Sequence, residues 1–227
     1  NVDGINTNGA VHLFSFADAA FNTPIFEATI GSGYAPVTTG NPKDRDVSLF
    51  FSEFGAAVSL DNNQLAVGDR GNIGFNADAI QLGSVFLYTF DSASGPFSTI
   101  SQTGIIGKDY IGVNDLDLSA LLVDYDEFGN SISLQGTQLV VSTHDDGFGD
   151  AAPGSGAVYL FTFEDALFNG PALQGIIGSG YNNINSGPAS YDLSVNADLE
   201  AGDGLFGVSL DNNRLAIGAT DSDGLNN

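Results

Sequence analysis

The chain has no cysteine, no methionine and no tryptophan among its 227 residues. Without thiols the fold can use neither disulfides nor thiolate-bound zinc, and no cysteine nucleophile is available. Oxidation of sulfur groups therefore cannot damage this protein. Histidine is also scarce, since only His12 and His144 occur.

Positive charge is nearly absent: five Lys and Arg residues stand against 28 Asp and Glu, which makes the formal net charge −23. Such a chain repels nucleic acid and anionic membrane surfaces, so we expect neither as a partner, and cations are its natural partners. Long hydrophobic runs are missing as well, because no stretch reaches the roughly 18 apolar residues of a membrane helix. We therefore expect no membrane insertion.

The first residues, NVDGINTNG, include neither an initiator methionine nor a signal sequence, so we expect a mature or excised piece of something longer. An acidic, thiol-free composition rich in Gly, Asn and Asp favours an extracellular protein of a bacterial cell surface. Composition alone leaves an acidic cytosolic protein open.

Glycine is abundant, with 30 residues, and occurs beside seven prolines and 42% apolar residues. The apolar residues form short runs separated by Asn, Asp and Ser clusters, a pattern typical of an all-β protein dense in turns. Helical periodicity over long windows is not evident.

Three landmarks recur along the chain. The first is a predicted hairpin with a polar turn, at Phe54 to Gly68, Phe128 to Ser142 and Leu205 to Gly218. The second is an aromatic strand that is apolar on both faces, at Asn8 to Phe16, Leu82 to Phe90 and Gly154 to Phe163. The third is a strand ending in Ile-Gly, at Thr29 to Tyr34, Ile105 to Tyr110 and Ile176 to Tyr181. The doubly apolar aromatic strand predicts burial on both faces, as in stacked sheets.

The hairpins recur about every 75 residues, at Val58, Ile132 and Val208. The sequence therefore predicts three repeats, one of which is divided between the two ends of the chain. The predicted units are the C-terminal half of a split blade plus a connection (1–53), two blade repeats (54–127 and 128–204) and the N-terminal hairpin of the split blade (205–227).

Each repeat offers four antiparallel strands followed by a variable polar connection, which is the unit of a β-propeller blade. The order of an FG pair, a V-S-L strand, an L-A-V-G strand, an Asp/Asn/Gly loop and a G-A-V-Y-L-F strand resembles the FG-GAP repeat of integrin-α-type propellers. It is similar also to the repeats of very large bacterial adhesin-like proteins. The resemblance covers essentially the whole chain and implies a propeller-like fold, but propellers host many functions.

Acidic loops follow the hairpin in the second and third repeats, as THDDGFGD and TDSDGLNN. Carboxylates clustered around a glycine can wrap a hard cation, and FG-GAP repeats are known for Ca²⁺-binding loops at this place. The candidate Ca²⁺ ligands are Asp145, Asp146, Asp150, Asp221, Asp223, Asn227 and, if the ends meet, Asp3. The spacing departs from the denser family pattern D-x-D-x-D-G-x-x-D, and the alternative is that these residues only form turns.

The first repeat departs further from that pattern. Its Asp69, Asn72, Asn76 and Asp78 are spread out, and Arg70 lies among them.

No catalytic constellation is evident, and we expect no enzyme. His12 occupies the slot of Phe86 and Tyr159, which favours a core or blade-packing role, and His144 lies in a loop position that varies between repeats. The chain lacks a G-x-S-x-G elbow and a phosphate-binding glycine loop followed by lysine. Close carboxylate pairs are uninformative when 28 acids are present.

A tyrosine follows the Ile-Gly strand in each repeat, at Tyr34, Tyr110 and Tyr181. Repetition favours a packing role against the next blade, and a platform for stacking carbohydrate is the alternative. The connection from Ile111 to Glu127, with four aspartates, is the most distinctive rim segment, and solvated charge is its default explanation.

A split repeat can be completed in two ways. The ends of one molecule can meet, which would make a ring of only three blades, or the C-terminal hairpin can pair with the N-terminal strands of the next unit and grow a filament. We favour the second, with an assembly interface formed by Val11, Leu13, Phe14, Leu210, Leu215 and Ile217. The expected function is a structural or adhesive surface repeat that assembles with itself; the alternative is a Ca²⁺-dependent module that binds a glycan or a protein.

Overall fold

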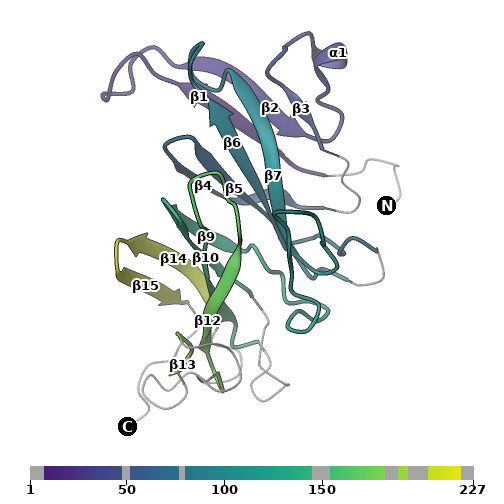
Figure 1. Cartoon of the computed structure of the whole chain (residues 1–227), viewed down its shortest axis with the longest axis vertical. Coiled ribbons are helices and arrows are strands. Elements are labelled where there is room, and N and C mark those ends of the chain that lie inside the picture. Colours follow the sequence, from purple (N-terminus) through teal and green to yellow (C-terminus); the bar gives the residue numbers. More distant parts are fainter. Residues whose placement is uncertain are drawn as a thin grey trace.

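A computed structural model describes residues 8–47, 52–76, 80–144, 154–181, 189–193 and 204–220. As expected, the protein is all-β, and α1 (Pro36–Thr39) is the one helix in these ranges, a single turn. No helix in the described part of the chain is long and apolar enough to cross a membrane. Figure 1 shows the strands gathered into separate sheets that follow one another along the molecule.

The described residues form four sheets, and we name them by their order in the chain. The N-terminal sheet contains β1 (Ala10–Ser15), β2 (Ile25–Gly31) and β3 (Arg45–Asp46). Sheet 1 contains β4 (Phe54–Asp61), β5 (Gln64–Asp69), β6 (Ser84–Asp91), β7 (Thr99–Gly107) and β8 (Leu116–Asp117). Sheet 2 contains β9 (Ser131–Gln135), β10 (Gln138–Ser142), β11 (Ala157–Thr162), β12 (Ala172–Gly178) and β13 (Tyr191–Asp192). The C-terminal hairpin contains β14 (Leu205–Asp211) and β15 (Arg214–Ala219).

Within sheets 1 and 2 the first four strands pair in chain order and antiparallel, as the three landmarks predict. The hairpin turns form where a residue tolerates left-handed backbone: Asn62, Gly136 and Asn212 have φ of 51°, 55° and 55°. The polar turn therefore defines the register of each hairpin from local sequence alone.

Sheets 1 and 2 differ from the predicted four-stranded unit by a fifth strand, and β3 has the matching place in the N-terminal sheet. The two-residue strands β3, β8 and β13 come from the polar connections and pair in parallel with the Ile-Gly strand. The connection is therefore partly an element of the sheet, and not only a loop.

Adjacent sheets are joined by three apolar clusters. The N-terminal sheet and sheet 1 share one, sheets 1 and 2 share the largest, and sheet 2 and the C-terminal hairpin share the third. In β6, Phe86 and Tyr88 join the first cluster while Val85 and Leu87 join the second. This alternation confirms burial on both faces for β6, because side chains along a strand point alternately to its two sides, whereas on β1 the face with His12 and Phe14 is exposed.

Glycine allows the close backbone approach between consecutive sheets. Gly83, with φ of 83°, forms a parallel bridge to Phe128, and a Cβ there would lie 2.0 Å from the Phe128 carbonyl oxygen. Gly9 repeats the contact with Phe54 at the preceding junction, also at 2.0 Å. The phenylalanine of the FG pair thus begins a new sheet where its backbone touches the sheet before it.

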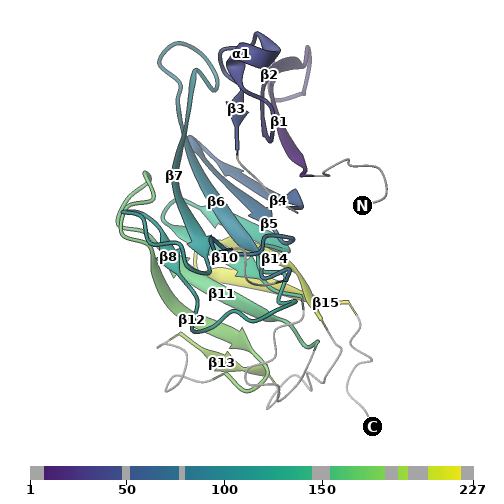
Figure 2. The same ribbon diagram turned by 90° about the vertical axis from the view of Figure 1, so that its right-hand side faces the viewer.

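The sheets form an open stack. The N-terminal sheet and the C-terminal hairpin lie toward opposite ends of the molecule in both views (Figures 1 and 2). In the described residues β1 pairs only with β2 and β15 only with β14, so the halves of the split repeat do not join within one chain.

Candidate functional site

The N-terminal end of the stack turns its two faces to different surroundings. Val11 and Leu13 on β1 are 7% and 5% exposed, in the cluster shared with sheet 1. Phe14 lies on the opposite face of β1 and is 48% exposed. Its ring meets that of Phe26 edge-on, with the ring centroids 5.6 Å apart. Of the three residues predicted for assembly on this strand, Phe14 lies on the open face and the other two pack inside the chain.

At the C-terminal end the three predicted assembly residues also have partners within the chain. Leu210, Leu215 and Ile217 are half-buried against Val140 and Val158 of sheet 2. Within one chain the structure does not bring them together with Val11, Leu13 and Phe14, because the two sets belong to the opposite ends of the stack.

His12 lies on the outer face of β1 beside Phe14 and is exposed, so the prediction of a core position does not hold within one chain. Its slot in the other sheets is buried because another sheet covers it, and here no described sheet does. The imidazole Nδ1 lies 3.0 Å from the hydroxyl of Thr29. Its aromatic neighbours are Phe26 and Tyr34.

The predicted Ca²⁺ ligands Asp3, Asp145, Asp146, Asp150, Asp221, Asp223 and Asn227 all lie outside the described residues. Among the residues that the structure does describe, no group of three or more His, Cys, Asp or Glu is placed to hold a metal ion. Ca²⁺ binding therefore stays a prediction from the sequence.

In the first repeat, Asp69 of the matching loop has a structural environment. Its carboxylate is fully buried and accepts hydrogen bonds from the Ser52 hydroxyl at 2.6 Å and the Glu53 amide at 2.8 Å. Burial raises the pKa of Asp69, and these hydrogen bonds oppose that rise. Asp69 thus ties the start of β4 to the end of β5.

The aspartates of the connection 111–127 hold the backbone in place. Asp115 accepts from the amides of Ile105 and Gly112, at 2.8 and 2.7 Å. Asp117 accepts from the Asp109 amide at 2.9 Å, and the Ser119 hydroxyl lowers the pKa of Asp117 by donating to it. Asp124 and Asp126 accept from the amides of Ile80 and Val123, at 3.1 and 2.6 Å.

The same two hydrogen bonds recur beside each fifth strand. The last residue of the strand accepts from an amide in the turn after the Ile-Gly strand, in the pairs Asp46 to Gly33 (2.7 Å), Asp117 to Asp109 (2.9 Å) and Asp192 to Gly180 (2.9 Å). The residue two positions earlier accepts from an amide of the Ile-Gly strand, in the pairs Asp44 to Thr29 (2.7 Å), Asp115 to Ile105 (2.8 Å) and Ser190 to Ile176 (2.8 Å). The signal in the sequence is D-R-D, D-L-D and S-Y-D, and its variable distance from the Ile-Gly strand conceals it.

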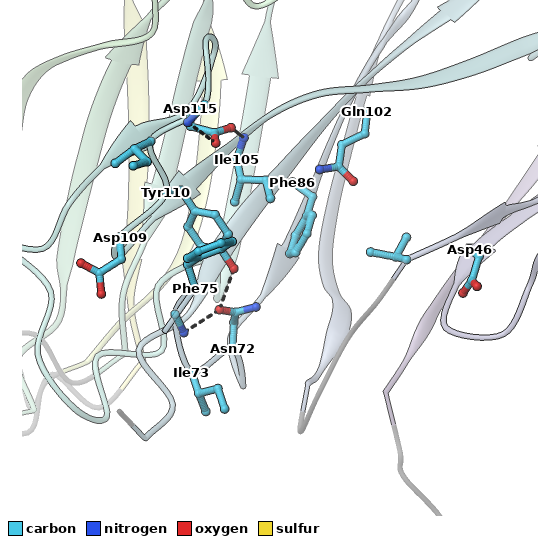
Figure 3. A pocket seen from close by; sticks show the side chains of 14 residues that line it. Asp46, Asn72, Ile73, Phe75, Phe86, Gln102, Ile105, Asp109, Tyr110 and Asp115 are labelled. Carbon is cyan, nitrogen blue, oxygen red and sulfur yellow. Dashed lines mark hydrogen bonds between the residues drawn. The ribbon is translucent and has the colours of Figure 1, made fainter. Parts of the chain in front are cut away.

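A cavity of about 720 Å³ lies between β3 and sheet 1 (Figure 3). Its wall includes Phe75 and Tyr110, whose rings are 6.0 Å apart, and the Tyr110 hydroxyl donates to Asn72 Oδ1 at 3.2 Å. Burial raises the pKa of Tyr110. Asp46 and Asp109 also line the cavity.

The strand-end tyrosines are packing residues to different degrees. Tyr181 is 2% exposed and belongs to the cluster between sheets 1 and 2, so its neighbour is the preceding sheet and not the next one. Tyr34 and Tyr110 are half-buried. In sheet 2 the surroundings of the strand-end tyrosine are filled by Leu118 and Leu122 of the connection, whereas around Tyr110 the 720 Å³ cavity remains.

The comparisons with known proteins address one repeat. Residues 123–161 match the sequence profile of the FG-GAP repeat, a segment that runs from the end of the connection through β9 and β10 into β11. No curated protein matches the chain. The match covers the FG pair at Phe128, whose backbone bridges to Gly83 of the preceding sheet. The chain therefore contains an FG-GAP-type repeat.

Proposed function

We propose that this protein is a structural or adhesive repeat module of the bacterial cell surface that assembles head-to-tail by completing a split β-blade, forming a filament or stalk. The role is non-catalytic. One observation carries the proposal: among the described residues the stack of sheets is open, with an unpaired strand edge at β1 and another at β15. Unpaired edges recruit further strands unless they are protected.

The two ends are complementary in their content. In the part of the chain that the structure describes, the N-terminal sheet has the aromatic strand, the Ile-Gly strand and the fifth strand, while the C-terminal end has only the hairpin that precedes them in sheets 1 and 2. A heterologous contact of this kind repeats without closing when its rotation does not return to the start, and the product is a filament.

The test is the size and shape of the purified chain as concentration rises. We expect light scattering to show growth with concentration and electron microscopy to show linear particles. Growth should increase with ionic strength, because salt screens the repulsion between copies that carry −23 each. Discrete monomers at every concentration and salt level would contradict the proposal.

A ligand-binding module is the second candidate, and the cavity beside Tyr110 favours it. Its volume falls within the range of small-molecule sites, and its wall combines aromatic rings with carboxylates. Glycan-array binding that disappears in Tyr110→Ala and persists in Tyr191→Ala, a substitution of an exposed tyrosine outside the cavity, would support this function. Retained binding in Tyr110→Ala would exclude the cavity as the site.

A further inference from the structure

Matching positions on β4 and β9 differ in exposure. Ile132 and Leu134 on β9 are 8% and 7% exposed, in the cluster with sheet 1. Val58 and Leu60 hold the same places on β4 and are both 53% exposed. The N-terminal sheet that precedes β4 has no hairpin strands in the described residues, so the part of a sheet that would cover Val58 and Leu60 is missing there.

The face of sheet 2 that points away from sheet 1 is also only partly covered. On sheet 1 the corresponding face presents Leu87, Ile106 and Leu118, which are 0%, 0% and 3% exposed because sheet 2 covers them. The matching residues of sheet 2 are Leu160, Ile177 and Leu193, and all three are only half-buried. The C-terminal hairpin covers part of this face, and no aromatic strand or Ile-Gly strand accompanies it in the described residues.

Aromatic side chains show the same contrast. Tyr88 and Phe161 are 1% and 2% exposed, whereas Phe14 in the same slot of β1 is 48% exposed. Phe168 is fully buried, with its ring centroid 4.9 Å from that of Phe163, whereas the matching Phe21 is 73% exposed. The apolar surface left open on the N-terminal sheet is therefore the surface that a preceding sheet covers elsewhere in the stack.

Hydrogen bonds between consecutive hairpins supply a register. The Leu134 amide donates to Ser59 Oγ at 3.0 Å, and the Gly136 amide donates to Asp61 Oδ2 at 2.6 Å. One sheet later, the Leu210 amide donates to Ser133 Oγ at 2.9 Å, and the Asn212 amide donates to Gln135 Oε1. The acceptors that follow in this series are Ser209 and Asp211 of the C-terminal hairpin, and the donors that precede it are the amides of Leu60 and Asn62.

We propose that the C-terminal hairpin of a second copy of this chain adds to β1 in the register that sheets 1 and 2 share. Sheet 1 pairs Gln64 with Thr89 and Asp69 with Ser84, and sheet 2 pairs Gln138 with Thr162. The matching pairs between copies are Arg214 with Ser15 and Ala219 with Ala10. This inference rests on the head-to-tail assembly proposed above and specifies its contact surface.

The second copy would pair the free edge of β1, cover the exposed apolar faces and continue the series of hydrogen bonds between hairpins. In this register Ser209 and Asp211 accept hydrogen bonds from the amides of Leu60 and Asn62, and the hairpin lies over Val58 and Leu60. Sheet 2 of the second copy then brings its half-buried Leu160 against Phe14. The strand edge adds backbone hydrogen bonds, and the covered faces add apolar burial.

The absence of cysteine permits a clean test by disulfide trapping. The variants Ser15→Cys with Arg214→Cys and Ala10→Cys with Ala219→Cys are in register, and we expect a ladder of covalent oligomers after mild oxidation. The exchanged combinations, Ala10→Cys with Arg214→Cys and Ser15→Cys with Ala219→Cys, separate the sulfurs by about five strand residues, roughly 16 Å. Disulfides require Cα atoms within about 7 Å, so these controls should stay uncrosslinked.

The outcomes separate the two proposals. Assembly of the unmodified chain without an in-register ladder, or with a ladder from the exchanged pairs, would overturn the register and leave head-to-tail assembly standing. An in-register disulfide formed within a monomer would overturn the second copy as the occupant. Absence of assembly by the unmodified chain would overturn both.

A second variant tests the covered surface without cysteines. Leu60→Asp places a carboxylate where the second copy is proposed to lie, and we expect at least a ~10-fold loss of association. Val113→Asp adds the same charge at a position that is 99% exposed in the connection, and it should leave association unchanged. Equal effects of the two substitutions would contradict the proposed surface.

Discussion

Leu134 and Leu60 occupy the same place in two similar strands, yet their surroundings differ. Leu134 on β9 is 7% exposed because sheet 1 covers it, whereas Leu60 on β4 is 53% exposed because the N-terminal sheet has no hairpin among its described residues. The strands read SISLQ and AVSLD, so their own sequences do not explain the difference. Burial of an apolar residue in this protein is determined by the neighbouring sheet.

In the interface between sheets 1 and 2, which is fully covered, we expect substitutions at the backbone bridge from Gly83 to Phe128 to lower stability most. Gly83→Ala places a Cβ 2.0 Å from the Phe128 carbonyl oxygen at φ of 83°, and we expect a loss of about 3 kcal/mol or more in the free energy of unfolding. Gly33→Ala is the matched control: φ is also 83°, but nothing lies within 4 Å, so it should cost only about 1 to 2 kcal/mol. Urea unfolding followed by circular dichroism measures both, and equal losses would contradict the role of close approach.

Leu134 and Leu60 directly compare the covered interface between sheets 1 and 2 with the partly uncovered face of β4. Leu134→Ala should lower the free energy of unfolding by about 2 to 4 kcal/mol, because it opens a cavity in a packed cluster. Leu60→Ala should cost less than about 1 kcal/mol in dilute solution, where its side chain is half in water. Thermal or urea melts of the two variants decide the matter, and similar losses would mean that Leu60 is covered even in the single chain.

Asp69 distinguishes the first repeat from the second, where Thr143 has the matching place. Burial raises the pKa of Asp69 in the folded state, so its contribution to stability is fully present below the unfolded pKa and is lost as pH rises through the folded pKa. Asp69→Asn should remove that fall, while Thr143→Ser should leave the pH dependence as it is in the unmodified chain. The measurement is the difference in unfolding free energy between variant and unmodified chain from pH 3 upward, and a constant difference would contradict the expectation.

We expect added Ca²⁺ to change stability least, and its effect should distinguish the first repeat from the second and third. The acidic loops with Asp145, Asp146 and Asp223 predict a rise of a few degrees in melting temperature at millimolar Ca²⁺ relative to a chelator. Combined Asp145→Asn and Asp146→Asn should reduce the rise, whereas Asn76→Ala in the first repeat should not. Mg²⁺ at equal ionic strength controls for screening, and an equal rise with Mg²⁺ would argue against a specific Ca²⁺ site.

Local features of the fold could be predicted well. The hairpin at Phe54 to Gly68 and the strand ending at Ile106-Gly107 appear where the alternation and the turn residues place them. These features depend on contacts close in sequence, so their signal is contained in a short window. Burial of both faces of β6 also follows from its unbroken apolar run.

The fifth strand and the assembly residues were harder to predict. β8 has two residues at a variable distance from β7, so no periodic pattern indicates it, and its anchoring depends on Asp115 and Asp117 accepting distant amides. For the assembly residues, strand alternation separates Leu13 from Phe14 but does not say which side a neighbouring sheet occupies. The cavity beside Tyr110 depends in the same way on what the preceding connection supplies.

From the sequence alone follow the all-β class, the four antiparallel strands of sheets 1 and 2 and the hairpin register, because turn chemistry and side-chain alternation are local properties. The FG-GAP-type pattern at Phe128-Gly129 is readable in the same way. The sequence does not determine which copies of a repeated residue are buried and which stay exposed, because that depends on the sheet lying across from each one. Leu60 and Leu134 carry the same side chain in the same local pattern, and only the arrangement of the sheets in space tells them apart.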